Sequence, residues 1–462
     1  MSNRRLAHSD LADFAAEYPD TGTEIKADRN NTGRPPGKVL SGDLASCAQQ
    51  HSITVRSSPV PFNRTLAPSE AMHTASGFYT GYTTGVRGQL DQAALSAAFQ
   101  FLRKTYPVLS CSITRDAMGG TSIGSEDDVS IVASLHGAQS DEPLAGFPDP
   151  GDRVTAVHVV RRGADLSWVT LLIHHAIADG AHGIQLLVDL WSFYADVVED
   201  REIVVCSHPY PQSIEKILSD RSLTVDPAEA PGADQPPTLS MMTVDTRLTV
   251  EATNALVTFG HRTNATINSL VSAALLMATT EALDIGIGEL VYTYSVNLRR
   301  RLIPPVGPAE GTNVLGIAQF TADVSAGKDI AALARAVTAK FSSDLAVGGV
   351  QHFYFHNIGD YMRSLPAMPG LPLWSTNLGK IPTLDSPADI AIEDFLISRY
   401  AQKPQFVTTS LSGGHIITTF NGQLNIWSTM PEIYASTVAN RVRTLLTDLR
   451  IYFGRSVRRK ME

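Results

Sequence analysis

The 462-residue sequence lacks several features that would place it in a simple class. It has three cysteines, Cys47, Cys111 and Cys206, and no CxxC pair, so neither a disulfide framework nor a zinc ribbon is supported. The formal net charge of -9 argues against a nucleic-acid binder, because such a protein needs a basic face. These absences exclude three simple classes, so the function has to be inferred from the motifs of the chain.

The sequence also lacks an apolar run long enough to cross a membrane. The longest candidate, INSLVSAALLMATTEAL, is interrupted by Asn268, Ser269 and Ser272, and the N-terminus has no apolar segment of a secretory signal. Hydrophobic residues make up 43% and charged residues 18%, which is a globular composition. We therefore expect a cytoplasmic protein that is not transmembrane.

Changes in composition along the chain predict four segments. Residues 1–62 are polar and rich in Asn, Gly, Ser and Pro, which predicts a loosely ordered extension with one short helix near Leu11–Tyr18. Residues 63–215 and 241–462 each mix strand-like and helix-like patterns, which predicts two lobes of an α+β fold. The Pro-rich residues 216–240 are expected to link the lobes.

An unusual pair of histidines follows an apolar run in the first lobe. The stretch TAVHVVRRGADLSWVTLLIHH predicts two strands joined by a turn at Gly163, and an amphipathic helix is expected after Gly180. His174 and His175 therefore end a strand, and Asp179 begins the turn into the helix. Because buried polar groups are costly without partners, the pair indicates either a hydrogen-bonded core network or a site of chemistry.

Three other patterns in the sequence suggest alternative functional sites. GTSIG, Gly120–Gly124, matches the GxSxG pattern of serine hydrolases, but it follows a Gly-Gly turn, which favours a hairpin. GIGEL, Gly286–Leu290, lacks the third glycine of a dinucleotide site and favours a loop. The spacing of His175, Asp179 and His182 permits a metal site, but metal sites usually need an oriented second shell, and we expect no metal.

A histidine at such a junction suits general-base catalysis, because its ordinary pKa of about 6.5 lets it accept a proton near neutral pH. HHAIADG fits the HHxxxDG signature of the superfamily that contains condensation domains and chloramphenicol acetyltransferase-like enzymes. With RTLAPSE, GQLDQAALSAAFQFLRKTYPVLS and VNLRRRLIPPVGPAEGTNVLG, it resembles the polyketide-associated acyltransferases, the branch typified by phthiocerol/phthiodiolone dimycocerosyl transferases. The resemblance runs from about Arg64 to the C-terminus.

The resemblance implies a fold and a role for each residue of the signature. The fold would be two chloramphenicol acetyltransferase-like lobes that form a pseudo-dimer, with a tunnel between them. His175 would be the general base that takes the proton from an acceptor hydroxyl as this oxygen attacks an acyl thioester. His174 and Gly180 would support the motif, and Asp179 would pair with Arg299 of the second lobe.

Two further stretches bear on the expected site. The family's partner segment usually reads Asp-Leu-Arg, whereas this chain has Asn297 in place of the aspartate. The stretch LPLWSTNLG is similar to a carrier-dependent family loop, so Ser375 and Asn377 are expected to line the tunnel. An acidic carrier protein would need a basic patch on this acidic chain, which Arg300 and Arg301 or the RSVRRK tail would supply.

The expected activity is transfer of an acyl group from a CoA or carrier-protein thioester to a hydroxyl of a lipid, polyketide or related product. No cofactor is expected apart from this thioester co-substrate. Amide formation, as in peptide synthetase condensation domains, would use the same base with an amine acceptor. The chain lacks adjoining adenylation and carrier modules, which favours a free-standing tailoring enzyme. A degenerate domain that only docks a carrier protein is the third alternative, although the second histidine and the aspartate are both present.

Overall fold

The structure, a computed structural model, describes residues 54–55, 62–74, 77–117, 119–125, 132–223, 240–323, 329–350, 371–402 and 413–448. The described residues belong to one compact unit, residues 53–462. The short helix predicted near Leu11–Tyr18 and the RSVRRK tail lie outside the described residues.

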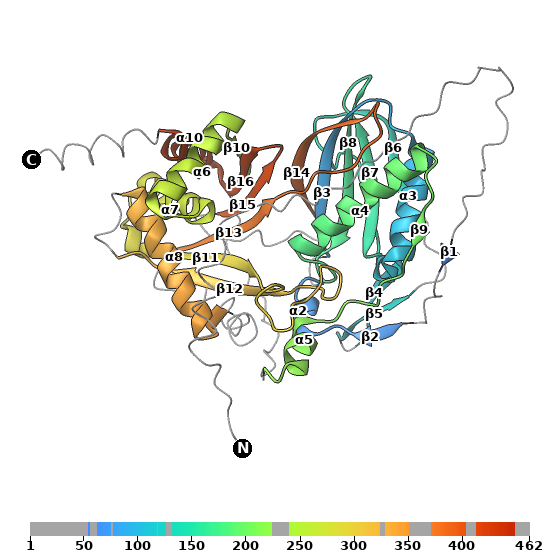
Figure 1. The fold of residues 1–462 in the computed structure, drawn as a ribbon, viewed down its shortest axis with the longest axis horizontal. Helices are drawn as coiled ribbons and strands as arrows, with labels where there is room; N and C mark the ends of the chain where they lie inside the picture. Colours follow the sequence, from blue (N-terminus) through green and yellow to red (C-terminus); the bar gives the residue numbers. More distant parts are fainter. Residues whose placement is uncertain are drawn as a thin grey trace, which may run out of the picture. The chain divides into compact units, whose positions relative to one another are not determined.

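A five-stranded sheet carries the histidine pair. Its strand order is β14–β3–β8–β7–β6. The strands are β3 (Phe78–Arg87), β6 (Val132–Gln139), β7 (Thr155–Arg161), β8 (Leu166–His174) and β14 (Ala391–Ala401). The helices α3 (Gln92–Thr105) and α4 (Gly180–Val198) pack against each other beside this sheet (Figure 1). Their apolar faces and one face of the sheet bury a core that includes Phe99, Leu171 and Trp191.

A six-stranded sheet forms the second half, in the order β10–β16–β15–β13–β11–β12. The strands are β10 (Met241–Arg247), β11 (Leu290–Asn297), β12 (Leu315–Phe320), β13 (Leu371–Lys380), β15 (Gly414–Phe420) and β16 (Gln423–Pro431). The helices of this half are α6 (Val250–Thr263), α7 (Ile267–Leu283), α8 (Ile330–Ala346) and α10 (Glu432–Thr447). Helix α7 contacts both α8 and α10 and is buried along most of its length, so it is the central helix of the second core.

Shorter elements complete the described chain. A three-stranded sheet contains β2 (Asn63–Thr65), β5 (Thr121–Ser125) and β4 (Cys111–Arg115), and β1 (Thr54–Val55) pairs with β9 (Val204–Val205). The short helices are α2 (Pro68–Ala71) and α5 (Ile214–Asp220), and the 3-10 turns are Pro107–Ser110 and Ile287–Glu289.

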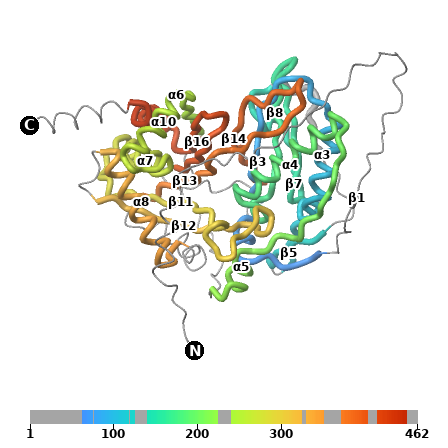
Figure 2. Tube along the Cα trace, viewed as in Figure 1, coloured from blue at the N-terminus to red at the C-terminus, as the bar shows by residue number. Residues whose placement is uncertain are grey.

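Strand β14 belongs by sequence to the second half but completes the first sheet. It pairs antiparallel with β3 from Ala391 opposite Arg87 to Ala401 opposite Phe78. Figures 1 and 2 show the two strands side by side, with β14 in brown-orange and β3 in blue. The predicted boundaries therefore do not separate the two sheets, because part of residues 241–462 is built into the sheet of residues 63–215.

Two local expectations differ from the structure. The linker was expected to begin at residue 216, but α5 continues to Asp220 and buries Ile217 and Leu218 in the second core. The stretch LPLWSTNLG, compared with a loop above, is strand β13, which pairs with β11 on one side and β15 on the other. Its position between two neighbouring strands is a long-range property that the local composition does not reveal.

Other local predictions are confirmed. The GTSIG stretch lies on β5, which forms a hairpin with β4, so Ser122 is not on the strained elbow of a hydrolase. Strands β7 and β8 pair as a hairpin, and α4 begins at Gly180 as expected. Strands β15 and β16 are joined by Asn421 and Gly422, both of which have positive φ, as a tight hairpin turn requires.

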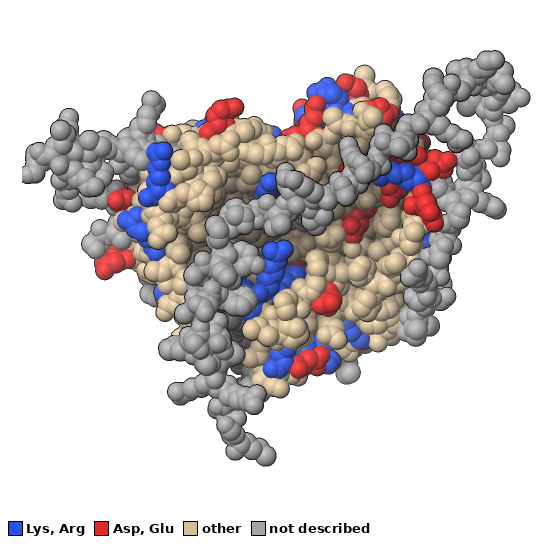
Figure 3. Space-filling model, viewed as in Figure 1, with Lys and Arg blue, Asp and Glu red and all other residues tan. Residues whose placement is uncertain are grey.

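No single helix in the described ranges is long and apolar enough to span a membrane. Helices α6 and α7 reach that length and composition only as a pair, and the chain bends by 100° between them. On the described surface in Figure 3, basic and acidic side chains lie in small separate groups.

Candidate active site

The ring of His175 lies between two other rings at the end of β8. The His73 ring stacks on it with centroids 4.2 Å apart and planes 6° apart, and the Phe78 ring stacks at 5.5 Å and 22°. The backbone is fixed as well, because the His175 N–H donates to the Phe78 carbonyl at 2.8 Å. The His175 Nδ1 is buried without a hydrogen-bond partner among the described residues, while the residue as a whole is partly exposed.

The surroundings of His175 favour its neutral form. Burial lowers the pKa of His175, against smaller opposing effects of its backbone hydrogen bond, Asp179 and Asn313, and Arg399 adds the smallest lowering effect. Burial and the adjacent His175 also hold the pKa of His73 well below its usual range. Both stacked imidazoles are therefore neutral near pH 7, and neutral His175 has a free lone pair with which to accept a proton.

His174 has a structural position. Its Nδ1 accepts the Ala176 N–H at 3.1 Å, and its ring meets the edge of the Tyr79 ring at 5.0 Å. Burial, together with the neighbouring His175, lowers the pKa of His174 to about 3. His174 is therefore a neutral, hydrogen-bonded core residue, which agrees with the expectation that it shapes the strand end.

Asp179 is fully buried and accepts four hydrogen bonds. Its Oδ1 accepts the N–H groups of Ala181 and His182 at 3.1 and 3.0 Å, which caps α4. Its Oδ2 accepts the Val314 N–H at 2.9 Å and forms a salt bridge with Arg299. The carboxylate thus joins the start of α4 to the segment that leads into the second sheet, as the family resemblance implied.

Arg299 is held in place by the chain around it. Its side chain donates from Nη2 to the Gly311 carbonyl at 2.9 Å, and its backbone N–H donates to the Asn297 side chain at 3.0 Å. The side-chain carbonyl oxygen of Asn297 thus accepts this hydrogen bond. The ion pair between Arg299 and Asp179 forms although asparagine stands where the family usually has aspartate.

Gly180 allows the second half to approach α4 closely. A Cβ atom at Gly180 would lie 2.3 Å from Cδ2 of Leu378 on β13, so a side chain here would push Leu378 away. The register of β13 with β15 shifts between Asn377 and Gly379, and Leu378, which lies at this irregularity, contacts the start of α4.

Ser375 and Asn377 connect β13 to α7. The Ser375 hydroxyl is 2.5 Å from the Tyr292 hydroxyl, which is 2.8 Å from Ser272 on α7. The Asn377 side-chain amide donates to Asn268, also on α7, at 2.8 Å. Both side chains therefore attach the sheet to its central helix, and their expected role in lining the tunnel stays a prediction.

The alternative metal site of His175, Asp179 and His182 is not formed. Both Asp179 oxygens are occupied by the hydrogen bonds given above, and only the backbone of His182 contacts them. The buried His182 ring lies toward Tyr106, with centroids 6.1 Å apart, and burial lowers the pKa of His182 to about 4. In the described chain, no three His, Cys, Asp or Glu side chains are grouped to hold a metal.

Several residues that hold the motif in place were not predicted from the sequence. Glu70, from RTLAPSE, is buried, binds Arg64 and accepts the Thr312 hydroxyl at 2.9 Å. The Thr312 carbonyl in turn accepts the Asp179 N–H at 2.9 Å. The Asn313 amide donates to the His175 carbonyl at 2.8 Å. The family resemblance includes the two stretches that contain these residues, RTLAPSE and VNLRRRLIPPVGPAEGTNVLG, but it did not indicate the hydrogen bonds that connect them.

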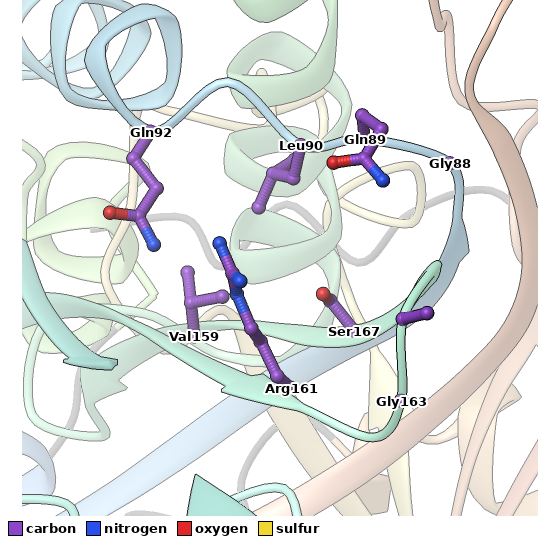
Figure 4. A pocket seen from close by; sticks show the side chains of 9 residues that line it. Gly88, Gln89, Leu90, Gln92, Val159, Arg161, Gly163 and Ser167 are labelled. Atoms are coloured by element: carbon purple, nitrogen blue, oxygen red, sulfur yellow. The ribbon is translucent and has the colours of Figure 1, made fainter. Parts of the chain in front are cut away.

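A small pocket opens at the opposite end of the first sheet. Figure 4 shows its lining, which includes Gln89, Gln92, Arg161 and Ser167. Ser167 lies seven residues before His174 on β8, about 23 Å away at 3.3 Å per residue. This pocket is therefore separate from the histidine motif.

Comparison with known proteins finds related transferases. Residues 237–428 match the family described as phthiocerol/phthiodiolone dimycocerosyl transferase C-terminus. The chain is 32% identical over 364 residues to the phthiocerol/phthiodiolone dimycocerosyl transferase of Mycobacterium leprae, covering 72% of this chain and 84% of that protein. It is 29% identical over 361 residues to the protein of the same name from Mycobacterium tuberculosis, with the same coverage.

Solved structures show the same fold. Polyketide synthase associated protein 5 from Mycobacterium tuberculosis superposes with a TM-score of 0.70 and 26% identity, over 84% of this chain and 97% of that one. The first condensation domain of the CDA synthetase superposes with a TM-score of 0.60 and 16% identity, again over 84% and 97%. The fold and the relatives thus define an acyltransferase with the chloramphenicol acetyltransferase-like fold. The chain belongs to the phthiocerol/phthiodiolone dimycocerosyl transferase family.

Proposed function

We propose that the chain transfers an acyl group from a CoA or carrier-protein thioester directly to a hydroxyl of a lipid, polyketide or related product. The observation that carries this proposal is the His175 ring, which stacks on His73 and Phe78 in a partly exposed residue at the end of β8. The names of the relatives support a lipid-like acceptor, since they describe a dimycocerosyl transferase for phthiocerol or phthiodiolone.

The proposed reaction needs one base and no covalent enzyme intermediate. Nε2 of His175 takes the proton of the acceptor hydroxyl as this oxygen attacks the thioester carbonyl carbon. The tetrahedral intermediate collapses, the carbon–sulfur bond breaks, and the leaving thiolate takes the proton from the imidazolium. The products are an ester and a free thiol, and neutral His175 is restored. We place the substrates in a tunnel between the two halves.

The acceptor test compares an alcohol with an amine. We expect the enzyme to transfer the acyl group of decanoyl-CoA to a long-chain alcohol and to show little transfer to the amine of equal length, with the products identified by mass spectrometry. A preference for the amine would contradict ester formation and favour the condensation reaction. Absence of transfer to either, with decanoyl and longer acyl donors on CoA and carrier protein, would favour a docking domain.

The pH dependence follows from the environment of His175. The base must be neutral, and burial places its pKa below the ordinary 6.5, so protonation removes activity only in acid. The charged groups that act on this ring are Asp179, which opposes the lowering, and Arg399, which adds to it. We expect kcat/KM to be level from about pH 6.5 to 8 and to fall below pH 6.5. An acid limb centred above pH 7 would contradict a base in this environment.

Stacking by His73 is expected to position the His175 ring. Because the buried Nε2 of His73 has no hydrogen-bond partner within the described part of the chain, the contribution of His73 is expected to come from its ring face. His73→Ala should lower kcat by up to about tenfold, since a stacked aromatic pair contributes about 0.5–1.5 kcal/mol. His73→Phe keeps a flat ring and should retain most of the rate. Equal damage in both variants would contradict the stacking role.

A further inference from the structure

Three consecutive residues just before β12 hold the backbone of the histidine motif. The Thr312 carbonyl accepts the Asp179 N–H at 2.9 Å. The Asn313 side-chain amide donates to the His175 carbonyl at 2.8 Å, and the Val314 N–H donates to the Asp179 carboxylate at 2.9 Å. All three residues are buried. A shift of this segment would therefore move the strand end from which the His175 ring projects.

Helix α2 supports the same histidine through its ring. His73 follows this helix, and its ring stacks on the His175 ring with centroids 4.2 Å apart. The His73 N–H donates to the Glu70 carbonyl at 3.1 Å, so the position of the His73 ring depends on the turn of α2 that contains Glu70. His175 thus has one support on its ring and another on its backbone, from segments far apart in the sequence.

The Glu70 carboxylate joins these two supports. Oε1 accepts the Thr312 hydroxyl at 2.9 Å and Nη2 of Arg64 at 2.7 Å. Oε2 accepts the Ala67 N–H at 2.9 Å and Nη1 of Arg64 at 2.6 Å. Glu70 is 0% exposed, and loss of any of these bonds would leave a buried polar group without a partner. The four bonds therefore fix α2 relative to the segment that contains Thr312.

We propose that Glu70 is a positioning residue for the acyl transfer, and that the hydrogen bond it accepts from Thr312 keeps the His175 ring in the orientation that proton transfer requires. This inference rests on the proposed function, in which His175 is the base. Glu70 acts through His73 on the ring and through Asn313 on the backbone. Because a misplacement of about 1 Å can lower a rate about 100-fold, a smaller shift of the base should lower kcat and leave KM nearly unchanged.

The test removes one hydrogen bond while nearly keeping the shape of the side chain. Thr312→Val lacks the hydroxyl, Thr312→Ser keeps it, and Glu70→Gln removes the carboxylate charge at the other end of the bond. The matched control is Glu215→Gln. Glu215 accepts the N–H and the hydroxyl of Ser69, each at 2.8 Å, so this variant disturbs α2 without removing the bond to Thr312. Melting temperatures would show whether each variant is folded.

Two measurements are made on each variant. Steady-state kinetics with decanoyl-CoA and a long-chain alcohol give kcat and KM separately. In protein labelled with ¹³C-histidine, the NMR signal of the His175 Cε1–H group reports stacking, because the face of the His73 ring shifts the signals of atoms above it. The chain has 13 histidines, so this signal is assigned by its loss in His175→Ala. The NMR measurement needs no turnover and therefore tests the positioning independently of the proposed function.

We expect Thr312→Val and Glu70→Gln to lower kcat about tenfold, to leave KM within about twofold, and to shift the His175 signal. Thr312→Ser and Glu215→Gln should keep the wild-type kcat and signal. An unchanged signal in folded Thr312→Val, or equal losses in Thr312→Ser and Thr312→Val, would overturn the inference. So would unfolding of both Thr312→Val and Glu70→Gln, because the bond would then serve stability alone. A wild type without transfer would contradict the proposed function, and the His175 signal would still decide the inference.

Discussion

His175→Ala is expected to lower kcat/KM for acyl transfer by about 10²–10⁴-fold, the usual contribution of a general base. The variant should remain folded, because the backbone contacts of residue 175 with Phe78 and Asn313 do not need the ring. Steady-state kinetics and a melting curve measure the two effects. Near-normal activity in a folded variant would show that another group removes the proton.

His174→Ala is the matched control for this variant. His174 is next to His175 but is engaged in the core through Ala176 and Tyr79, so its removal should reduce stability first and activity less directly. If His174→Ala caused the larger loss of kcat at equal stability, the roles of the two histidines would have to be exchanged.

Asp179→Ala and Arg299→Ala are each expected to reduce the melting temperature, the soluble yield and the activity. Asp179 is 0% and Arg299 3% exposed, so each single variant leaves an unpaired buried group. Breaking a buried pair in this way costs about 3–5 kcal/mol of the free energy of unfolding. Asp179→Asn separates the two contributions of this residue, because asparagine can still cap α4 but carries no charge.

A double-mutant cycle shows whether the pair is coupled. The variant with both Asp179→Ala and Arg299→Ala should be less destabilised than the sum of the single variants, because neither charge is then unpaired. Strict additivity of the free energies of unfolding would contradict the salt bridge between α4 and the segment after β11.

The local part of the site could be predicted from the sequence. The strand that ends at His174, the cap at Asp179 and the helix that begins at Gly180 all depend on neighbouring residues. Side-chain chemistry and turn geometry act over such short distances, so a linear pattern contains them. The pairing of Asp179 with Arg299 came from the family resemblance, since no periodicity connects residues so far apart.

The remainder of the site depends on contacts between distant segments. His73 follows a short helix and Arg399 lies on the strand that crosses into the first sheet, and nothing in either local sequence indicates His175 as a neighbour. The hydrogen bonds of Ser375 and Asn377 that connect β13 to α7 also depend on distant segments, so their residue types alone did not indicate these contacts.

Intact-protein mass spectrometry during turnover tests the central claim, direct transfer with His175 as the base. The enzyme would be mixed with decanoyl-CoA, first without and then with a long-chain alcohol, and the masses of the protein and of the ester would be measured. We predict that the ester accumulates while the mass of the protein stays unchanged at every time point. A protein mass increased by one decanoyl group, and restored when the alcohol is added, would contradict direct transfer and require a covalent acyl-enzyme.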